Sequence, residues 1–87
     1  MKAVRVGALW CPSCLIMRSR WNKVFAAHPE IEIEEVDYDE QPQRVENLAV
    51  GTLLPVVILM KNDLEVTRVI GEKSAKDLAR WAEEWLR

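Results

Sequence analysis

The sequence predicts an α/β fold in which helices cover both faces of a four-stranded mixed sheet, in the order β-α-β-α-β-β-α. Three observations support this prediction. A helical pattern separates the first two predicted strands, so that pair should be parallel with a right-handed crossover. Two later apolar runs are separated by only three turn-forming residues, which predicts an antiparallel hairpin. The chain ends in an amphipathic helix, which needs a sheet face to bury its apolar side.

The first half of the chain predicts a strand, a helix and a second strand. Residues 2–9 form the first strand, with two valines on one face and smaller or polar residues on the other. Pro12 suits the first helical turn, because its missing N–H would have no intrahelical partner there. The helix should end just before Pro29, since the residue before a proline avoids helical geometry. Residues 31–37 form the second strand. The apolar stripe of the helix consists of Cys14, Met17, Trp21, Val24 and Phe25.

The second half predicts a short helix, a hairpin and a final helix. A turn at residues 39–42 opens the short helix, and Gly51 is its expected stop. Residues 56–60 form a buried strand, and residues 64–70 return beside it. After a break at Gly71, the last helix has the cleanest amphipathic stripe in the chain. Its capping pair is Ser74 and Asp77, and its apolar side consists of Leu78, Trp81, Ala82, Trp85 and Leu86.

The bulk composition is that of one ordinary globular domain covering residues 1–87. Apolar residues make up 49% of the chain and charged residues 30%, with a net charge of −2. Basic and acidic residues alternate without a basic block, so we expect no nucleic-acid partner. No apolar run approaches the roughly 20 residues that span a bilayer, and residues 1–7 lead us to expect no secretory signal. We therefore expect a cytoplasmic protein that makes no membrane contact and acts as a monomer.

Both cysteines lie in the segment Trp10-Cys11-Pro12-Ser13-Cys14, where the first strand gives way to the helix. Two thiols separated by two residues can close a small disulfide ring if a helical turn holds them together. A helix that begins at Cys11 also favours its thiolate, which is the species that attacks disulfides. We expect Cys11 to be the nucleophile, and Cys14, more buried, to resolve the mixed disulfide. The cysteine pair is then the redox group, and no metal or organic cofactor is expected.

These residues resemble the thioredoxin superfamily over nearly the whole chain. The cysteine segment matches the family's Trp-Cys-x-x-Cys element at the end of the first core strand. Pro55 stands where the family keeps its cis-proline, residues 36–39 resemble the family's strand exit, and Gly71 resembles the entry into its final helix. The resemblance implies a thioredoxin-like fold and a thiol–disulfide oxidoreductase that acts through residues 11–14 on protein disulfides.

The resemblance also implies roles for five residues around the cysteines. Trp10 would flank the exposed sulfur and offer an apolar surface to substrates, although simple packing at the strand end is an equal alternative. Pro55 in the cis conformation would present the backbone of Leu54 to a substrate strand. Pro12 and Ser13 would tune the redox potential, which spans roughly −270 to −120 mV across proteins with different intervening pairs.

One position departs from the family pattern. Thioredoxins keep a buried aspartate six residues before the first cysteine, paired with a lysine on the neighbouring strand, and the aspartate helps to move protons. Here Arg5 stands at the first position and Glu35 at the second, so the signs are exchanged. Glu35 could take over proton transfer, held by Arg5. Alternatively, the two form an exposed ion pair that contributes little.

Three alternatives to a thioredoxin-like enzyme remain open. Electrons could come from a flavin reductase or, in a glutaredoxin-like protein, from glutathione. The segment at residues 70–74 resembles thioredoxin, whereas the Cys-Pro start of the motif is also found in glutaredoxins. A metal module is a second class, but zinc needs four ligands and only Cys11, Cys14 and distant His28 are available. A binding domain without turnover is the third.

Overall fold

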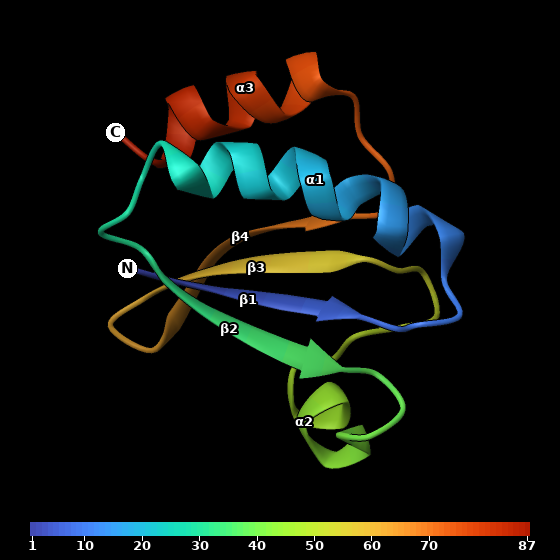
Figure 1. Ribbon diagram of the computed structural model, residues 1–87. Coiled ribbons are helices and arrows are strands. Elements are labelled where there is room, and N and C mark those ends of the chain that lie inside the picture. The colour runs from blue at the N-terminus through green and yellow to red at the C-terminus, as the bar shows by residue number, and fades with distance from the viewer.

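A computed structural model describes residues 1–87 and contains the predicted elements in the predicted order (Figure 1). The sheet order is β2-β1-β3-β4, with β1 parallel to β2 and antiparallel to β3, and with β3 antiparallel to β4. The fold class predicted from the sequence is confirmed. The elements are β1 (Lys2–Gly7), α1 (Pro12–Ala26), β2 (Glu32–Asp37), α2 (Pro42–Asn47), β3 (Val56–Lys61), β4 (Leu64–Ile70) and α3 (Ala75–Trp85).

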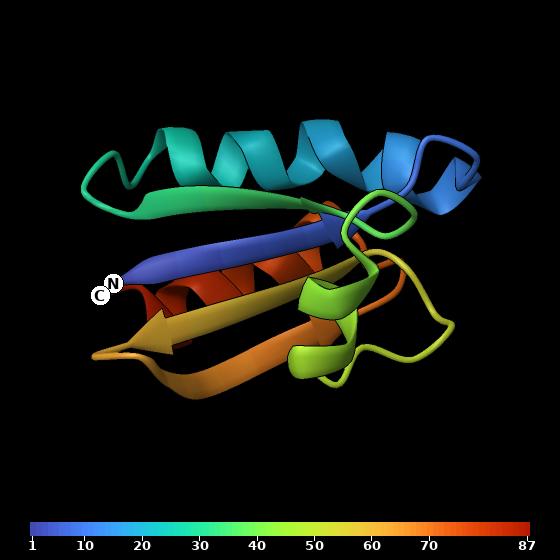
Figure 2. The ribbon, with the colours of Figure 1, turned by 90° about the horizontal axis from the view of Figure 1, so that it is seen from below.

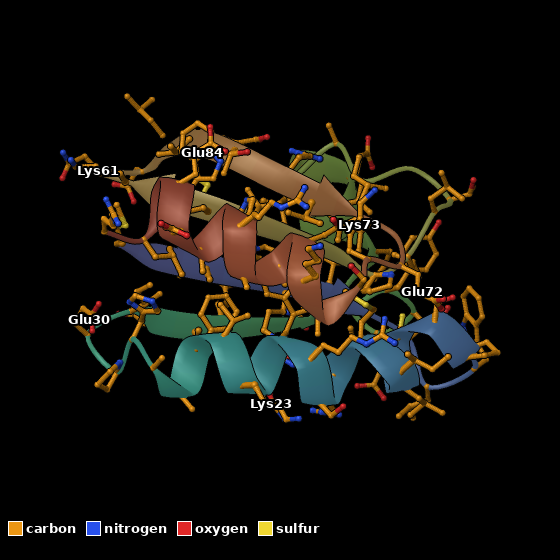
Figure 3. The ribbon with its side chains drawn as sticks, turned by 90° about the horizontal axis from the view of Figure 1, so that it is seen from above. Lys23, Glu30, Lys61, Glu72, Lys73 and Glu84 are labelled. Atoms are coloured by element: carbon orange, nitrogen blue, oxygen red, sulfur yellow. The ribbon has the colours of Figure 1, made fainter.

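Helices cover both faces of the sheet, so the central strands are buried on both sides. Helices α1 and α3 lie side by side over one face, and α2 lies against the other (Figures 1, 2 and 3). Neighbouring residues of β1 therefore point into different cores: Ala3 faces α1 and α3, and Val4 faces the α2 side, both with almost no exposure. This double burial explains why Ala3, Val4 and Val6 are all buried although they lie on alternating faces of β1.

Two apolar cores result, one on each face of the sheet. The α1/α3 core consists of Ala3, Met17, Trp21, Phe25, Ile31, Val57, Leu59, Leu78 and Leu86. The α2 core consists of Val4, Val6, Ala8, Cys11, Val36, Val45, Leu54, Val56 and Ile58. The first core is built from long side chains of two helices. The second includes one of the two cysteines.

Local signals in the sequence place the element ends well. The hydroxyl of Ser74 accepts the N–H of Asp77 at 3.1 Å and caps α3 as predicted. In the β3–β4 hairpin, Asn62 and Asp63 take positive φ angles of 53° and 64°. Both residue types tolerate this left-handed region, which the favoured two-residue hairpin turn requires.

The end of α2 differs from the prediction. The helix ends at Asn47, and the residue with left-handed backbone is Ala49, with φ of 55°, rather than Gly51. The N–H of Ala49 bonds the carbonyl of Glu46, and the N–H of Val50 bonds that of Val45. This pair of reversed hydrogen bonds is the Schellman ending. It leaves Gly51 in the exposed chain beyond the helix.

None of the three helices combines the length and the apolar composition that crossing a membrane requires.

Candidate functional site

Cys11 follows the turn after β1 and is the N-cap of α1. The strand stops at Gly7, two residues before the predicted end, and a turn follows in which the Cys11 N–H bonds the carbonyl of Ala8 at 3.2 Å. The Cys11 sulfur accepts the backbone N–H of Cys14 at 3.2 Å. Pro12 occupies the first helical turn, as predicted. The sulfur therefore sits at the positive end of the helix with a donor aimed at it, an arrangement that stabilises a thiolate.

Cys14 lies one helical turn further along, against the backbone of β1. A Cβ atom built on Gly7 would lie 3.5 Å from the Cys14 sulfur, an ordinary van der Waals contact, so Cys14 packs directly beside the backbone of Gly7. Both cysteines are free thiols. Burial raises the pKa of the Cys14 thiol to about 11, and the hydrogen bond with Cys11 adds to the shift. Cys14 is therefore a protonated thiol at neutral pH.

The relative burial of the two cysteines is the reverse of the prediction. Cys11 is only 6% exposed, whereas Cys14 is half-buried. The physical reason is that the Cys11 side chain turns into the α2 core, beside Leu54, while Cys14 packs only against the edge of that core. Helical phase alone could not show this, because the burial of an N-cap residue depends on the loops that pack over it.

Leu54 and Pro55 lie near Cys11, although more than forty residues separate them in the sequence. The Leu54–Pro55 peptide bond is cis, the conformation that the resemblance implies. The Leu54 side chain is buried in the α2 core with Cys11. The N–H and C=O of Leu54 make no hydrogen bond in the structure, whereas the carbonyl of Pro55 accepts the N–H of Gly71 at 2.8 Å. Two adjacent backbone groups beside the cysteine are therefore unpaired.

Trp10 is 60% exposed, but two residues of the β2 exit hold its ring. Its indole N–H donates to Asp39 Oδ2 at 2.5 Å, and the ring meets Tyr38 edge-on with centroids 6.2 Å apart. The carboxylate of Asp37 accepts the N–H groups of Asp39 and Glu40 and shapes that turn. These contacts were not predicted. One signal was available in the sequence. The carboxyl ends of the parallel neighbours β1 and β2 lie at the same edge of the sheet, so the residues that follow these two strands should lie close together.

Exposed apolar side chains flank the cysteine segment and were also missed. For Leu15 and Ile16, the only signal in the sequence is a position in the helix outside the predicted apolar stripe, and the residues outside the helix carried no periodic signal. The sequence predicts burial more readily than it predicts a functional apolar surface, because a buried stripe is periodic and an exposed one is local. The missed residues are Leu9, Leu15, Ile16 and, next to Leu54, Leu53, whereas the apolar surface of Trp10 was predicted from the resemblance.

Arg5 and Glu35 are register partners on β1 and β2, and they form an ion pair with 3.4 Å between Nε and Oε1. The Arg5 side chain is 12% exposed and also donates to Asn22, whereas the Glu35 side chain is 56% exposed. Burial lowers the pKa of Arg5, and the Glu35 carboxylate opposes that shift. The predicted pairing is thus present, with the cation on the inner side.

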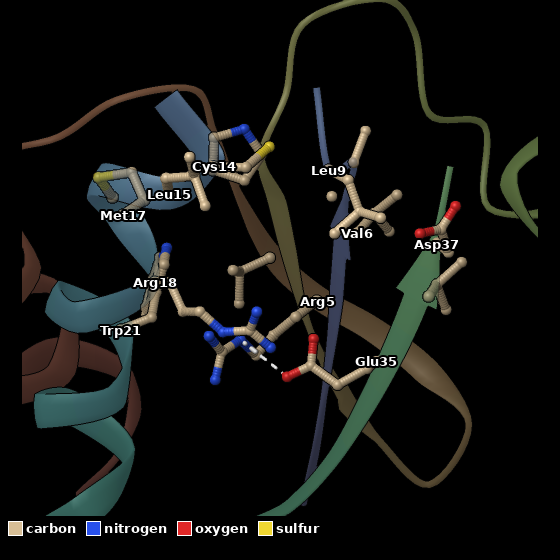
Figure 4. Close-up of a pocket in the computed structure, with 15 residues that line it drawn as sticks. Arg5, Val6, Leu9, Cys14, Leu15, Met17, Arg18, Trp21, Glu35 and Asp37 are labelled. Atoms are coloured by element: carbon tan, nitrogen blue, oxygen red, sulfur yellow. Dashed lines mark ion pairs between the residues drawn. The ribbon is translucent and has the colours of Figure 1, made fainter. Parts of the chain in front are cut away.

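The ion pair and Cys14 line one hollow of about 240 Å³ (Figure 4). Arg18 contributes a second guanidinium to it, close enough to Arg5 to lower its pKa further. Among the predicted residues, the structure brings Cys11 and Leu54 together in the α2 core. Pro55 lines the hollow with Cys14, and Arg5 and Glu35 line the same hollow. His28 lies apart, at the far end of α1, with Nδ1 3.3 Å from the carboxylate of Glu30.

Comparisons with known proteins agree with this geometry. The sequence model of the family described as thioredoxin matches residues 3–84. The chain is 32% identical over 73 residues to a thioredoxin of Chlamydia trachomatis, which covers 84% of this chain and 71% of that protein. A thioredoxin of Chlamydia pneumoniae is 31% identical over 71 residues, covering 82% of this chain and 69% of its own length.

Solved structures show the same fold. The crystal structure of Trxlp from Edwardsiella tarda superposes with a TM-score of 0.83 at 30% identity, over 92% of this chain and 79% of that one. Thioredoxin 1 from Thermosipho africanus gives the same TM-score at 24% identity, over 99% and 94% of the two chains, and supports the fold alone. The chain therefore belongs to the thioredoxin family and is a thiol–disulfide oxidoreductase.

Proposed function

We propose that the chain reduces protein disulfides with Cys11 as the nucleophile and Cys14 as the resolving thiol. The observation that supports this assignment most directly is the hydrogen bond from the Cys14 N–H to the Cys11 sulfur at the start of α1. The Cys11 thiolate attacks one sulfur of the substrate disulfide, and the other substrate sulfur leaves as a thiolate that takes a proton from solvent. The product of this step is a mixed disulfide on Cys11.

The second step closes the ring. Cys14 loses its proton and attacks the Cys11 sulfur, which breaks the mixed disulfide and releases the second substrate thiolate. The substrate disulfide has then gained two electrons and two protons, and the protein dithiol has become the Cys11–Cys14 disulfide. Because the pKa of Cys14 is raised to about 11, this step needs a proton acceptor at neutral pH.

Glu35 is the proton acceptor that we propose, with Arg5 holding its carboxylate. The support is that Cys14 and Glu35 line the same hollow, which is large enough to hold water between them. Glu35→Gln should lower turnover severalfold near pH 7, and the deficit should shrink toward pH 9, where hydroxide can remove the proton. Glu30→Gln, at the far end of α1, is the matched control. If the Glu35 variant keeps wild-type turnover from pH 6 to 9, Glu35 is not the proton acceptor. Its contact with Arg5 is then only an exposed ion pair.

Trp10, Leu54 and Pro55 form the proposed substrate contact. Leu54 has a free backbone donor and acceptor beside Cys11, which can pair with an extended peptide segment. Leu53 and Leu9 are also exposed and offer apolar contact. A protein segment carrying a disulfide satisfies both features, whereas a small disulfide uses neither.

Insulin reduction with dithiothreitol as the electron source tests the proposal. The wild-type chain should accelerate the reduction, Cys11→Ser should abolish the acceleration, and Cys14→Ser should accumulate a mixed disulfide detectable by mass spectrometry. Equal rates for wild type and Cys11→Ser would refute the assignment of the nucleophile.

For the electron donor we propose a flavin-dependent reductase rather than glutathione. The support is the match to thioredoxins and the thioredoxin-like segment at residues 70–74. Coupled assays with a thioredoxin reductase and with glutathione plus glutathione reductase separate the two donors. The reduction potential, which Pro12 and Ser13 should tune, sets the direction of electron flow.

We further infer that residues 1–87 act as one domain, as a monomer, in the reducing cytoplasm. The support is that the only two cysteines form the reactive pair, which leaves none for a structural disulfide. Size-exclusion chromatography with light scattering tests the monomer, and metal analysis of protein purified without chelator tests the alternative of a metal shared through the cysteine pairs.

A further inference from the structure

The segment at residues 48–55, here called the strap, connects the end of α2 to β3 and carries the cis-proline. Residues 51–54 make no hydrogen bond through backbone or side chain. Residues 51–53 are also exposed, so packing does not fix them either. The buried side chain of Leu54 holds one point of the strap. The place of its backbone beside Cys11 must therefore depend strongly on how the two ends are held.

Arg68, in the middle of β4, holds the first end of the strap. Its guanidinium donates through Nη2 to the carbonyl of Leu48 at 2.9 Å and through Nη1 to that of Ala49 at 3.4 Å. The same guanidinium forms a fork on the carboxylate of Glu65, with both N–O distances 2.6 Å. The Arg68 side chain is only 22% exposed. Its position is therefore well defined, and it directs two donors at the chain leaving α2.

The second end of the strap is held by Gly71, which lies three residues after Arg68, just beyond the end of β4. The N–H of Gly71 donates to the carbonyl of Pro55 at 2.8 Å. Both attachment points thus belong to β4 and its exit, which form the edge of the sheet away from β2. β4 does not pair with β1, the strand that leads to the cysteines. It nevertheless holds the strap that faces them.

The first attachment point is under local strain. Ala49 has φ of 55°, a left-handed backbone that is unfavourable for an L-residue with a Cβ. The Schellman hydrogen bonds satisfy the carbonyls of Val45 and Glu46. The carbonyls of Leu48 and Ala49 lie just beyond the last helical residue of α2, and Arg68 is their only partner. Without Arg68 the strap would lose its polar contact with β4 at this end.

We propose that Arg68 is a positioning residue for substrate binding, because it sets where the strap presents Leu54 to a substrate beside Cys11. This inference rests on the proposed use of the Leu54 backbone as a substrate contact. Arg68 does not touch Cys11 or Cys14, so it should not change their chemistry. Its removal should weaken the binding of a protein disulfide and leave the reaction of Cys11 with a small disulfide unchanged.

The test compares a protein substrate with a small reagent. In Arg68→Gln, KM for insulin should rise at least fivefold while kcat stays within twofold. The rate of Cys11 with 5,5′-dithiobis(2-nitrobenzoate) should also stay within twofold of wild type. Arg87→Gln, which removes an exposed arginine paired with Glu83 on the last turn of the chain, is the matched control and should change neither value. A KM within twofold of wild type, or equal losses with both substrates, would overturn the proposal.

Two further variants keep the test informative if Arg68→Gln folds poorly. Glu65→Gln leaves the donors to Leu48 and Ala49 in place, and its KM should stay close to wild type. Arg68→Lys keeps a cation but not the two-armed donor, and its KM should lie between those of wild type and Arg68→Gln. A larger KM in Glu65→Gln than in Arg68→Lys would show that the ion pair, rather than the hold on the strap, matters.

Amide exchange separates this inference from the proposed function. The Gly71 N–H, which bonds the carbonyl of Pro55, should exchange at least fivefold faster in Arg68→Gln than in wild type, whereas amides of α1 should not change. Unchanged exchange at Gly71 would overturn the role of Arg68 even if insulin activity is present. A wild-type chain without insulin activity would instead overturn the proposed function, and the exchange result would still report on the strap.

Discussion

The two faces of the sheet are held by different physical means. On the face of α1 and α3, helices of 15 and 11 residues bury large aromatic side chains. Trp21 stacks on Phe25 with ring centroids 5.5 Å apart and meets Trp81 edge-on at 5.1 Å. Aromatic side chains bury large apolar areas, so Trp21 and Phe25 contribute strongly to the stability of this face.

The opposite face is covered by α2, which has six residues and a single buried side chain, Val45. Polar contacts supplement that packing. Arg44 forms a fork on Glu34 of β2, with N–O distances of 3.0 and 2.9 Å, and Arg68 of β4 holds the carbonyls that follow the helix. A short helix cannot bury enough apolar area to fix its own position, and here guanidinium groups from two directions provide the rest.

The difference teaches where function is placed in this fold. Cys11 and Leu54 both lie in the core of the α2 face, where the covering helix buries a single side chain. Binding segments are commonly drawn from the less stable parts of a protein, because they must adapt to a partner. We therefore expect the α1/α3 face to act as the rigid support and the α2 face to open first.

The largest expected effect is on the rigid face. Trp21→Ala should lower the free energy of unfolding by about 3–5 kcal/mol, the usual cost of removing a buried aromatic side chain. Val45→Ala on the α2 face removes two methyl groups and should cost roughly 1–2 kcal/mol. Urea denaturation followed by circular dichroism measures both. Equal losses for the two variants would contradict the distinction between the faces.

A smaller effect is expected from pH, and it concerns the polar contacts of α2. Hydrogen bonds from Arg44, and then from Lys2, lower the pKa of Glu34 to about 2 from its ordinary value of 4.5. A depressed carboxyl pKa stabilises the fold fully above pH 4.5, and that stabilisation is lost as the pH falls through about 2. The Glu34 side chain is 26% exposed, and solvent reduces the contribution to roughly 1 kcal/mol.

Glu34→Gln isolates this contribution. Thermal unfolding between pH 5 and pH 2 should show a shallower loss of stability in the variant than in wild type. Glu83→Gln, which removes an equivalent carboxylate from the surface of α3, should keep the wild-type slope. The same slope in all three proteins would mean that the Arg44–Glu34 fork does not contribute to stability.

The smallest expected effect is a gain. Ala49→Gly should remove the left-handed strain of roughly 1–2 kcal/mol, partly offset by the greater freedom of glycine in the unfolded chain, about 0.4–1 kcal/mol. The net stabilisation should be roughly 0.5 kcal/mol, which corresponds to a rise in Tm of about 3 °C. Ala27→Gly is the control, because Ala27 ends α1 with an ordinary φ of −80° and gains no relief. It should lower Tm.

Much of the site could be predicted from the sequence because its signals are local. The order of elements, the cap at Ser74, the hairpin turn and the place of Cys11 at a helix start depend on residues within about four positions of one another. The cis bond before Pro55 and the pairing of Arg5 with Glu35 followed from a resemblance over the whole chain, and both are present in the structure.

The features that were wrong or missed depend on contacts between distant segments. The prediction that α2 stops at Gly51 was wrong, because Ala49 takes the left-handed position. The Ala49 carbonyl accepts a hydrogen bond from Arg68, a residue almost twenty positions away. Cys11 is more buried than Cys14 because it shares a core with Leu54. The position of the Trp10 ring depends on its hydrogen bond to Asp39. Hydrophobic periodicity tells which side of an element is inside, but it carries no information on which distant side chain packs over a loop. A chain's local propensities specify its elements, and the order of burial at the cysteines arises only when those elements meet.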